Sequence, residues 1–299
     1  MLQFVMHKKE TSLEHSKICN DLLNYINENI QSEINIDTLS MEFSVSKYHL
    51  HRIFKEQMGK NIYETIKDIR LQKASNLLIT NKYSTITQVA NLCGYNSSIS
   101  FIRAFKQRFN QTPKQWRNGG YKIYSDMILG SSKTASMAKV DFSHLQAKIV
   151  KTDPLKAYYI RQKGYNKNAK QTWQKMLAWT YTNNLKDYKQ IGIYHDNPII
   201  TPLDDCHYVA CVVPKGDKTK LTNTSLPYFI IPSIVCAVFE VEGKYGDILN
   251  LIQWVYHKWL PNSGYETNTI PSYTVFEKNH FLEDDERFKV KYYVPISYV

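Results

Sequence analysis

The chain has 299 residues, of which 43% are hydrophobic and 22% charged, a composition that excludes an intrinsically disordered protein. At roughly 100 to 200 residues per domain, this length predicts two domains. The net charge of +11 at pH 7 favours a polyanionic partner. The basic side chains are concentrated, because residues 44–117 hold 13 Lys and Arg against three Asp and Glu. A quarter of the chain therefore carries most of the net charge, a distribution typical of a nucleic-acid-binding surface.

The five cysteines are an odd number with no Cys-x-x-Cys pair, and several lie in apolar runs. This usage predicts reduced core thiols rather than disulfides or a metal site. The longest apolar run, FIIPSIVCAVF, is short and contains Pro232. The first ten residues hold no apolar stretch of the kind found in signal peptides. We therefore expect a cytoplasmic protein with no membrane association, no metal and no cofactor.

Apolar residues recur at helical spacing between residues 16 and 117, and the pattern predicts seven helices. Asp37 is the expected N-cap of the second helix, and Ser46 that of the third, which Gly59 ends. The pattern restarts after residue 85 with a short helix and a second capped helix, SSISFIRAFKQRF, opened by Ser97. The expected ranges of the first four helices are 13–30, 37–43, 47–58 and 62–79.

A short helix, a tight turn and a helix with a basic outer face form the sequence pattern of a helix-turn-helix, and the chain shows it twice. In the second copy Phe101, Phe105 and Phe109 share one face, which predicts that this face is buried. The opposite face carries small hydroxyls and cations. Such a face suits a DNA major groove, because Arg can bond guanine and Lys can pair with phosphate. The expected DNA contacts are Ser46, Lys47, Tyr48, His51, Arg52, Lys55, Ser97, Ser98, Ile99, Ser100, Arg103 and Lys106.

The segment TQVANLCGYNSSISFIRAFKQRFNQTPKQWR resembles the second helix-turn-helix of AraC/XylS-type transcription regulators, and VSKYHLHRIFKEQMG is similar to the first. Asn110 stands where the family usually has Gly, but Asn tolerates the left-handed conformation that ends a helix. The resemblance covers residues 15–119 and implies an all-α N-terminal domain with two helix-turn-helix motifs joined by a long helix, which binds double-stranded DNA. The matching positions are Ala90, Gly94, Tyr95, Ser97, Phe101, Arg103, Phe105, Lys106, Pro113, Trp116 and Arg117.

The composition changes after residue 119. Small and polar residues over 120–146 predict a linker, and β-branched and aromatic alternation follows. The segments AYYIRQKGY, KQTWQKMLAWTYTNNL, QIGIYHD and HYVACVVP predict a strand-helix-strand-strand unit, and a second unit begins at VCAVFEVEGKY. Two such repeats predict an α+β C-terminal domain, in which one antiparallel sheet has both helices on one face and a cleft on the other. The expected domains are 1–119 and 147–299.

The segments GIYHDNPIITPLDDCHYVACV, WLPNSGYE and YVPI resemble the GyrI-like, SOUL-related effector-binding domain, across residues 147–299. The resemblance implies an apolar cleft for a small aromatic or amphipathic effector. Family members commonly hold one buried Glu for cations, in a pattern where this chain has PSYTVF, with Thr274 and Phe276. Changing Thr274 to Glu is therefore expected to favour cationic aromatics. The expected cleft residues are Tyr159, Trp173, Tyr194, Tyr208, Trp254 and Tyr273.

Three functions stay open. The leading hypothesis is a ligand-responsive transcription regulator and not an enzyme. A small-molecule hydrolase is the first alternative, although no Ser or Cys nucleophile is visibly positioned for His195 and Asp196, and we assign no catalytic residue. The other is a DNA-binding protein whose second half docks a partner such as RNA polymerase. Turnover of candidate ligands and a pull-down of polymerase subunits separate the three.

Overall fold

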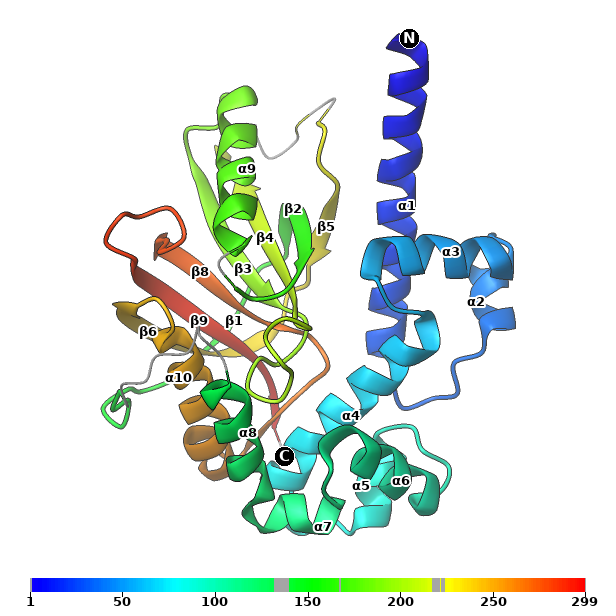
Figure 1. Cartoon of the computed structure of the whole chain (residues 1–299), viewed down its shortest axis with the longest axis vertical. Helices are drawn as coiled ribbons and strands as arrows, with labels where there is room; N and C mark the ends of the chain where they lie inside the picture. The colour runs from blue at the N-terminus through cyan, green and yellow to red at the C-terminus, as the bar shows by residue number, and fades with distance from the viewer. Residues whose placement is uncertain (1, 132–139, 167, 217–220, 222–223, 299) are drawn as a thin grey trace.

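The computed structural model of the chain describes residues 2–131, 140–166, 168–216, 221 and 224–298, with side chains from Glu10 onward. Figure 1 shows a helical first half beside a curved sheet formed by the second half. No helix in these ranges is long and apolar enough to cross a membrane. The helices are α1 Leu2–Glu28, α2 Ile36–Glu42, α3 Lys47–Met58, α4 Ile62–Thr80, α5 Ile86–Leu92, α6 Ser98–Phe109, α7 Pro113–Gln115, η1 Trp116–Gly120, α8 Tyr121–Gly130, α9 Asn168–Thr182, α10 Asp247–Trp254, η3 Val255–Trp259 and η4 Leu260–Asn262.

The helix ends follow from local capping chemistry. Ser46 accepts a hydrogen bond from the N–H three residues on, and Gly59 ends α3 in the left-handed conformation at φ 69°, so both predicted caps are confirmed. Asn110 ends α6 in the same way at φ 52°. The prediction that Asp37 caps α2 is wrong. Asn35 is the cap and accepts from the Asp37 N–H at 2.8 Å, which puts the Asp37 carboxylate in the first turn, where the helix dipole favours it.

α1 is longer than the apolar pattern predicts, because it begins at Leu2 rather than near Leu13. No Gly or Pro interrupts this stretch, and each residue added to an existing helix gains a further hydrogen bond. Among the side chains described from Glu10 onward, the first buried one is that of Ser16. The pattern therefore marks the packed part of the helix, while Figure 1 shows its N-terminal end extending beyond the rest of the protein.

The first helix-turn-helix has an apolar cluster of its own, whereas the core of the second is continuous with that of the second half. In the first, α1 and α3 bury a cluster that includes Leu22 and Phe54. In the second, the rings of Phe101, Phe105 and Phe109 follow one another at centroid distances of 5.7 and 4.5 Å. These three phenylalanines are buried as predicted. α4 joins the two units.

The second half folds into one antiparallel sheet, in the order β1-β6-β9-β8-β3-β4-β2-β5, with β7 paired to β9. The described strands are β1 Lys148–Lys151, β2 Leu155–Lys163, β3 Tyr188–Tyr194, β4 His207–Pro214, β5 Tyr228–Ile231, β6 Val235–Lys244, β7 Tyr265–Thr267, β8 Ser272–Lys278 and β9 Arg287–Tyr298.

Side chains alternate between the two faces of this sheet. One face, which includes Tyr158 and Tyr208, packs against α9 and α10. The opposite face, which includes Tyr159 and Tyr273, forms a separate apolar cluster to which β5 contributes. The Tyr159 hydroxyl accepts a hydrogen bond from Asn20 at 3.0 Å, so this second face is turned toward α1.

The two halves of the chain are packed against each other. Asn76 of α4 donates to the Thr267 hydroxyl of β7 at 2.9 Å. The loop between β3 and β4, residues 195–206, lies on the helical half, where Arg108 of α6 donates to the Ile200 carbonyl at 3.1 Å. The sheet is thereby fixed against helices of both helix-turn-helix units.

The segment expected to be a linker, residues 120–146, contains α8. The Tyr121 ring of this helix lies 4.8 Å from the His257 ring, so α8 packs on the helical layer of the second half. Residues 132–139 lie outside the described part of the chain.

Candidate DNA interface and effector cleft

α3 presents a cationic outer face. Tyr48 is 80% exposed, and Arg52 and Lys55 are exposed one and two turns further along the helix. A terminal nitrogen of Arg52 lies 3.1 Å from Nδ1 of His49, a contact that restricts this long side chain. The face therefore offers one aromatic ring and two cations to a partner.

The other three residues predicted on this helix have partners within the protein. Ser46 uses its hydroxyl oxygen as the N-cap. Lys47 forms an ion pair with Asp37 of α2. His51 is half-buried, with its ring 5.9 Å from that of Tyr63. Their role as DNA contacts stays a prediction.

α6 presents the second outer face. Ser97 is its N-cap and accepts the Ser100 N–H at 3.4 Å, while Ser98 is half-buried. Among the described residues, no carboxylate pairs with Arg103 or Lys106. Both cations are therefore available to a polyanion. The exposed residues of this face are Ile99, Ser100, Arg103 and Lys106.

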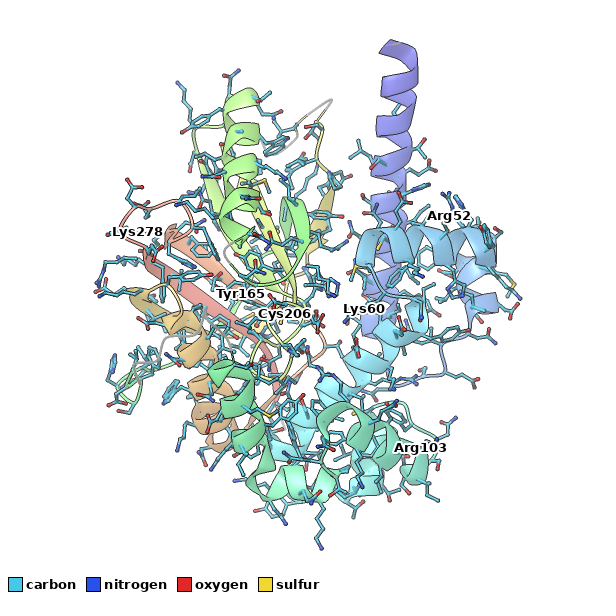
Figure 2. All side chains as sticks on the ribbon, in the orientation of Figure 1. Arg52, Lys60, Arg103, Tyr165, Cys206 and Lys278 are labelled. Carbon is cyan, nitrogen blue, oxygen red and sulfur yellow. The ribbon has the colours of Figure 1, made fainter. Side chains whose placement is uncertain are left out.

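The two outer faces belong to one rigidly connected unit. Figure 2 shows Arg52 and Arg103 near opposite ends of α4, both on the side away from the sheet. Gly94 makes the turn before α6 at φ 73°, and a Cβ there would lie 2.5 Å from the Ile30 carbonyl oxygen. Arg70 of α4 donates to the same carbonyl at 3.1 Å. The end of α1 is thus fixed to the turn before α6.

A cavity of about 430 Å³ opens between α1 and the sheet face opposite α9 and α10. α1 supplies one wall, with Leu23 and Asn27, and the sheet supplies the other, with Ile193 and Tyr273. Phe229 and its neighbours on β5 close one side. We call this cavity the α1 cleft. Because its walls come from both halves, a bound molecule would contact both.

Two basic side chains line the α1 cleft. Burial, together with the charge of Arg161, lowers the pKa of His195 to about 3, so this ring is neutral at pH 7. Arg161 of β2 donates from Nη2 to Oδ1 of Asn20 at 3.1 Å, and its guanidinium carbon lies 5.1 Å from the Tyr159 ring centroid. The one charged group on the sheet wall is therefore cationic.

The six aromatic residues expected in the cleft are divided between the two faces of the sheet. Tyr273 lines the α1 cleft, and Tyr159 lies on the same face. Tyr194 and Tyr208 point from the sheet to the helical layer, which contains Trp173 on α9 and Trp254 on α10. The Trp173 indole donates to the Tyr208 hydroxyl at 3.2 Å. Their role in ligand binding stays a prediction. The four on the helical side are Trp173, Tyr194, Tyr208 and Trp254.

Thr274 lies on the helical side of β8 and not in the α1 cleft. It is fully buried, and its hydroxyl donates to the Gly192 carbonyl at 3.3 Å. The expectation that a glutamate at this position favours cationic aromatics stays a prediction, and the α1 cleft does not contain this position. Successive side chains of a strand point to opposite faces, and on β8 it is Tyr273 that faces the cleft.

Sequence reasoning missed Arg161 and the wall that α1 provides. The alternation along AYYIRQK places Arg161 on the same face as Tyr159, and a charge in such a strand was a usable signal. Asn20, Asn24 and Asn27 follow one stripe of α1 and all line the cleft. From sequence alone, a polar stripe on a helix predicts a solvent-exposed face, because the sequence does not show which domain packs against it.

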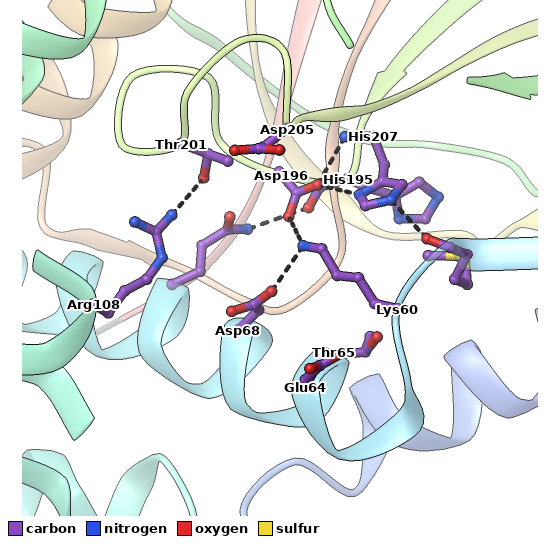
Figure 3. A network of polar contacts seen from close by, with 12 residues as sticks. Lys60, Glu64, Thr65, Asp68, Arg108, His195, Asp196, Thr201, Asp205 and His207 are labelled. Carbon is purple, nitrogen blue, oxygen red and sulfur yellow. Dashed lines mark hydrogen bonds and ion pairs between the residues drawn. The ribbon is translucent and has the colours of Figure 1, made fainter. Parts of the chain in front are cut away.

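His195 and Asp196 are adjacent in sequence but have different partners. The Asp196 carboxylate accepts from the His207 N–H at 2.8 Å and lies 2.7 Å from the His207 ring nitrogen (Figure 3). Burial raises the pKa of Asp196, but the bond from His207 and the charge of Lys60 outweigh it and hold this pKa below its usual value. The described residues contain no cluster of His, Cys, Asp and Glu that could hold a metal.

The fold and the two surfaces define a helix-turn-helix protein whose second half is an antiparallel sheet with helices on one face. A family model described as a helix-turn-helix domain matches residues 39–119, and one described as a GyrI-like small molecule binding domain matches residues 145–297. The chain belongs to the AraC-type transcription regulators and carries a GyrI-like domain as its second half.

Curated relatives match the first half. Over 105 residues the chain is 35% identical to the probable transcription factor PqrA of Proteus vulgaris, a match that covers 34% of this chain and 85% of PqrA. It is 33% identical over 100 residues to the transcriptional activator RhaS of Escherichia coli, covering 33% of this chain and 36% of RhaS. The chain thus spans about a third of the length of RhaS.

Solved structures match each half separately. An AraC-type regulator from Chromobacterium violaceum is 25% identical, with a TM-score of 0.33, and the match covers 35% of this chain and 93% of that structure. The C-terminal domain of EcmrR is 14% identical, with a TM-score of 0.38, and the match covers 52% of this chain and 99% of that domain.

Proposed function

We propose that the chain regulates transcription by reading DNA with α3 and α6 and by binding a small effector in the α1 cleft. The observation that carries the proposal is the pair of exposed cationic faces, with Arg52 on α3 and Arg103 on α6, on the side of the protein away from the sheet. Arginine is the side chain best suited to guanine edges, and lysine and serine contact phosphates. Membership of the AraC-type regulators supports double-stranded DNA as the partner.

The DNA-binding part is tested with the full chain. Sites are first selected from a pool of random duplexes, and the affinities of the wild type, Arg52→Ala and Arg103→Ala are then measured on the selected and a scrambled duplex. If the arginine reads a base, its replacement by Ala should weaken binding by about 1 to 3 kcal/mol on the selected duplex and leave binding to the scrambled duplex unchanged. Lys151→Ala removes an exposed cation from β1 and is the matched control. Selection that returns no sequence preference would contradict the proposal.

The position of the α1 cleft supports an effector role. α1 packs against α3 in the first apolar cluster, so a ligand on α1 touches the helix that supports the reading helix. His195, on the opposite wall, begins the β3–β4 loop, which Arg108 of α6 holds. An effector that moves α1 relative to the sheet would change how both reading helices are held. A largely apolar cavity of about 430 Å³ suits a small aromatic or amphipathic molecule.

Finer features of the architecture belong to the same proposal. The order β6-β9-β8 beside β3-β4-β2 supports two strand-helix-strand-strand repeats joined edge to edge. The boundaries 1–119, 120–146 and 147–299 remain our proposed division. Binding without turnover of an effector in the α1 cleft would separate a sensor from a hydrolase. A contact with RNA polymerase is inferred only from the proposed role in transcription. Co-purification with polymerase subunits tests it.

A further inference from the structure

Arg161 is held inside the α1 cleft with most of its hydrogen-bonding capacity unused. Its Nε and Nη1 atoms are buried and have no hydrogen-bond partner among the described residues. Its Nη2 atom donates a hydrogen bond to Oδ1 of Asn20. A guanidinium has five N–H donors, and a buried donor without an acceptor costs free energy. The site therefore lacks an acceptor group.

The groups around Arg161 are neutral. No described carboxylate forms an ion pair with it. Burial raises the pKa of the Cys19 thiol beside it to about 11, and burial also raises the pKa of Tyr159. His195, in the loop that follows β3, is neutral as well. Among the described residues, the half-buried guanidinium of Arg161 thus has no counter-charge.

The cleft contains one carboxylate among the described residues that line it, that of Glu28. Glu28 is the last residue of α1 and is exposed, so water screens its charge. The unpaired nitrogens of Arg161 are buried, where the same charge acts over a lower effective dielectric constant. A ligand that enters the cleft therefore meets a weak negative charge at the end of α1 and a strong positive one on the sheet wall.

We propose that the α1 cleft takes a small amphipathic carboxylate, whose carboxylate bonds to Arg161 and whose apolar part lies against Ile193, Phe229 and Tyr273. The inference rests on the proposed effector role of the cleft and assigns the charge of the effector. Guanidinium and carboxylate form strong charge-assisted hydrogen bonds. The ligand supplies the missing counter-charge. Arg161 is also hydrogen-bonded to Asn20 of α1, so a ligand bound to Arg161 would be linked to α1 through this side chain.

The test uses three probes of one shape and different charge: 2-naphthoate, neutral 2-naphthamide and cationic 2-naphthylmethylamine. Each is titrated into the full chain at neutral pH by calorimetry. We expect 2-naphthoate to bind about tenfold or more tightly than the amide, and the amine to bind more weakly than the amide. Tighter binding of the amine, or equal binding of amide and carboxylate, would overturn the assignment.

Two variants of Arg161 locate the effect. Arg161→Gln keeps hydrogen-bonding groups without charge, so it should remove the preference for 2-naphthoate while leaving the affinity for 2-naphthamide within about twofold. Arg161→Lys keeps the charge and should keep part of the preference. Lys163→Gln is the matched control, because Lys163 is an exposed cation two residues along the same strand and pairs with Asp205. A preference that survives in Arg161→Gln, or is lost equally in Lys163→Gln, contradicts the proposal.

The outcomes distinguish this inference from the function on which it rests. If 2-naphthoate and 2-naphthamide bind equally, and Phe229→Trp weakens the binding of both, the cleft is still an effector site but does not prefer a negative charge. Failure of all three probes to bind at millimolar concentration would argue against the cleft as an effector site and would overturn both. Thermal melting shows whether each variant is folded. Where a variant is unfolded, the three probes of different charge on the wild type test the proposal.

Discussion

The ring of His207, at the start of β4, donates from Nε2 to the carbonyl oxygen of Met58, the last residue of α3, at 2.9 Å. Its other ring nitrogen lies 2.7 Å from the Asp196 carboxylate (Figure 3). Both partners are acceptors, so each ring nitrogen of His207 has an acceptor within hydrogen-bonding distance. One side chain of the sheet thereby holds the end of a helix proposed to read DNA.

Replacing His207 with Leu should weaken this junction. The change leaves the buried Asp196 carboxylate short of a donor and the Met58 carbonyl unpaired, which is expected to cost about 1 to 3 kcal/mol. The free energy of unfolding is measured in urea, with His144→Leu as the control, because His144 is exposed. A loss no larger than that of the control would show that the junction contributes nothing measurable.

α3, α6 and the sheet face that carries the cleft were predictable from sequence, whereas most of the residues that line the cleft were not. The start and the buried face of α6 follow from local sequence, because Ser97 caps the helix and Phe101 and Phe105 recur at helical spacing. Arg161 and Asn20 meet only because β2 and α1, 141 residues apart, pack together. Alternation tells which face of a strand a residue occupies, but not what covers that face. Local patterns therefore gave the elements, and long-range packing decided the site.

Changing Thr274 to Glu should destabilise the fold. Thr274 is fully buried between strands, and the Tyr208 hydroxyl packs against the neighbouring Gly192. A carboxylate there would be larger and would have no cationic partner, a combination expected to cost about 3 kcal/mol or more. Urea unfolding of Thr274→Glu is compared with that of Thr274→Ser, which keeps the hydroxyl. Unchanged stability, or a new affinity for cationic aromatics, would show that this position is more open than its burial indicates.

Stability should fall on mild acidification, and His280 should contribute. Burial lowers the pKa of His280 to about 3, and its ring lies 4.1 Å from that of Phe281. Between this value and the unfolded pKa of about 6.5, the unfolded chain binds more protons than the folded one. The contribution is fully present above pH 6.5, and about 2 kcal/mol of it is lost by pH 5.

The measurement compares urea unfolding at pH 7.5 and pH 5. His280→Phe cannot be protonated and matches the ring contacts of the buried site, so it should lose about 2 kcal/mol less than the wild type between the two conditions. His144→Phe, at an exposed position, serves as the control and should follow the wild type. Parallel losses in all three proteins would mean that other groups produce the acid sensitivity.

One chain should occupy two successive major grooves of an asymmetric site. α4 has 19 residues, which at ~1.5 Å per residue gives about 28 Å, and the widths of the flanking helices bring α3 and α6 close to the ~34 Å of one DNA turn. The Gly94 turn, with Arg70 bonded to the Ile30 carbonyl, keeps this spacing fixed. Sedimentation of the complex on a selected site should therefore show one protein per duplex. The exposed cations on both helices should also make the affinity fall steeply with salt, by a slope of roughly 0.9 per phosphate contacted. A strict two-to-one stoichiometry on inverted half-sites would instead require each chain to read a single groove, and the fixed spacing of α3 and α6 would then have no role in recognition.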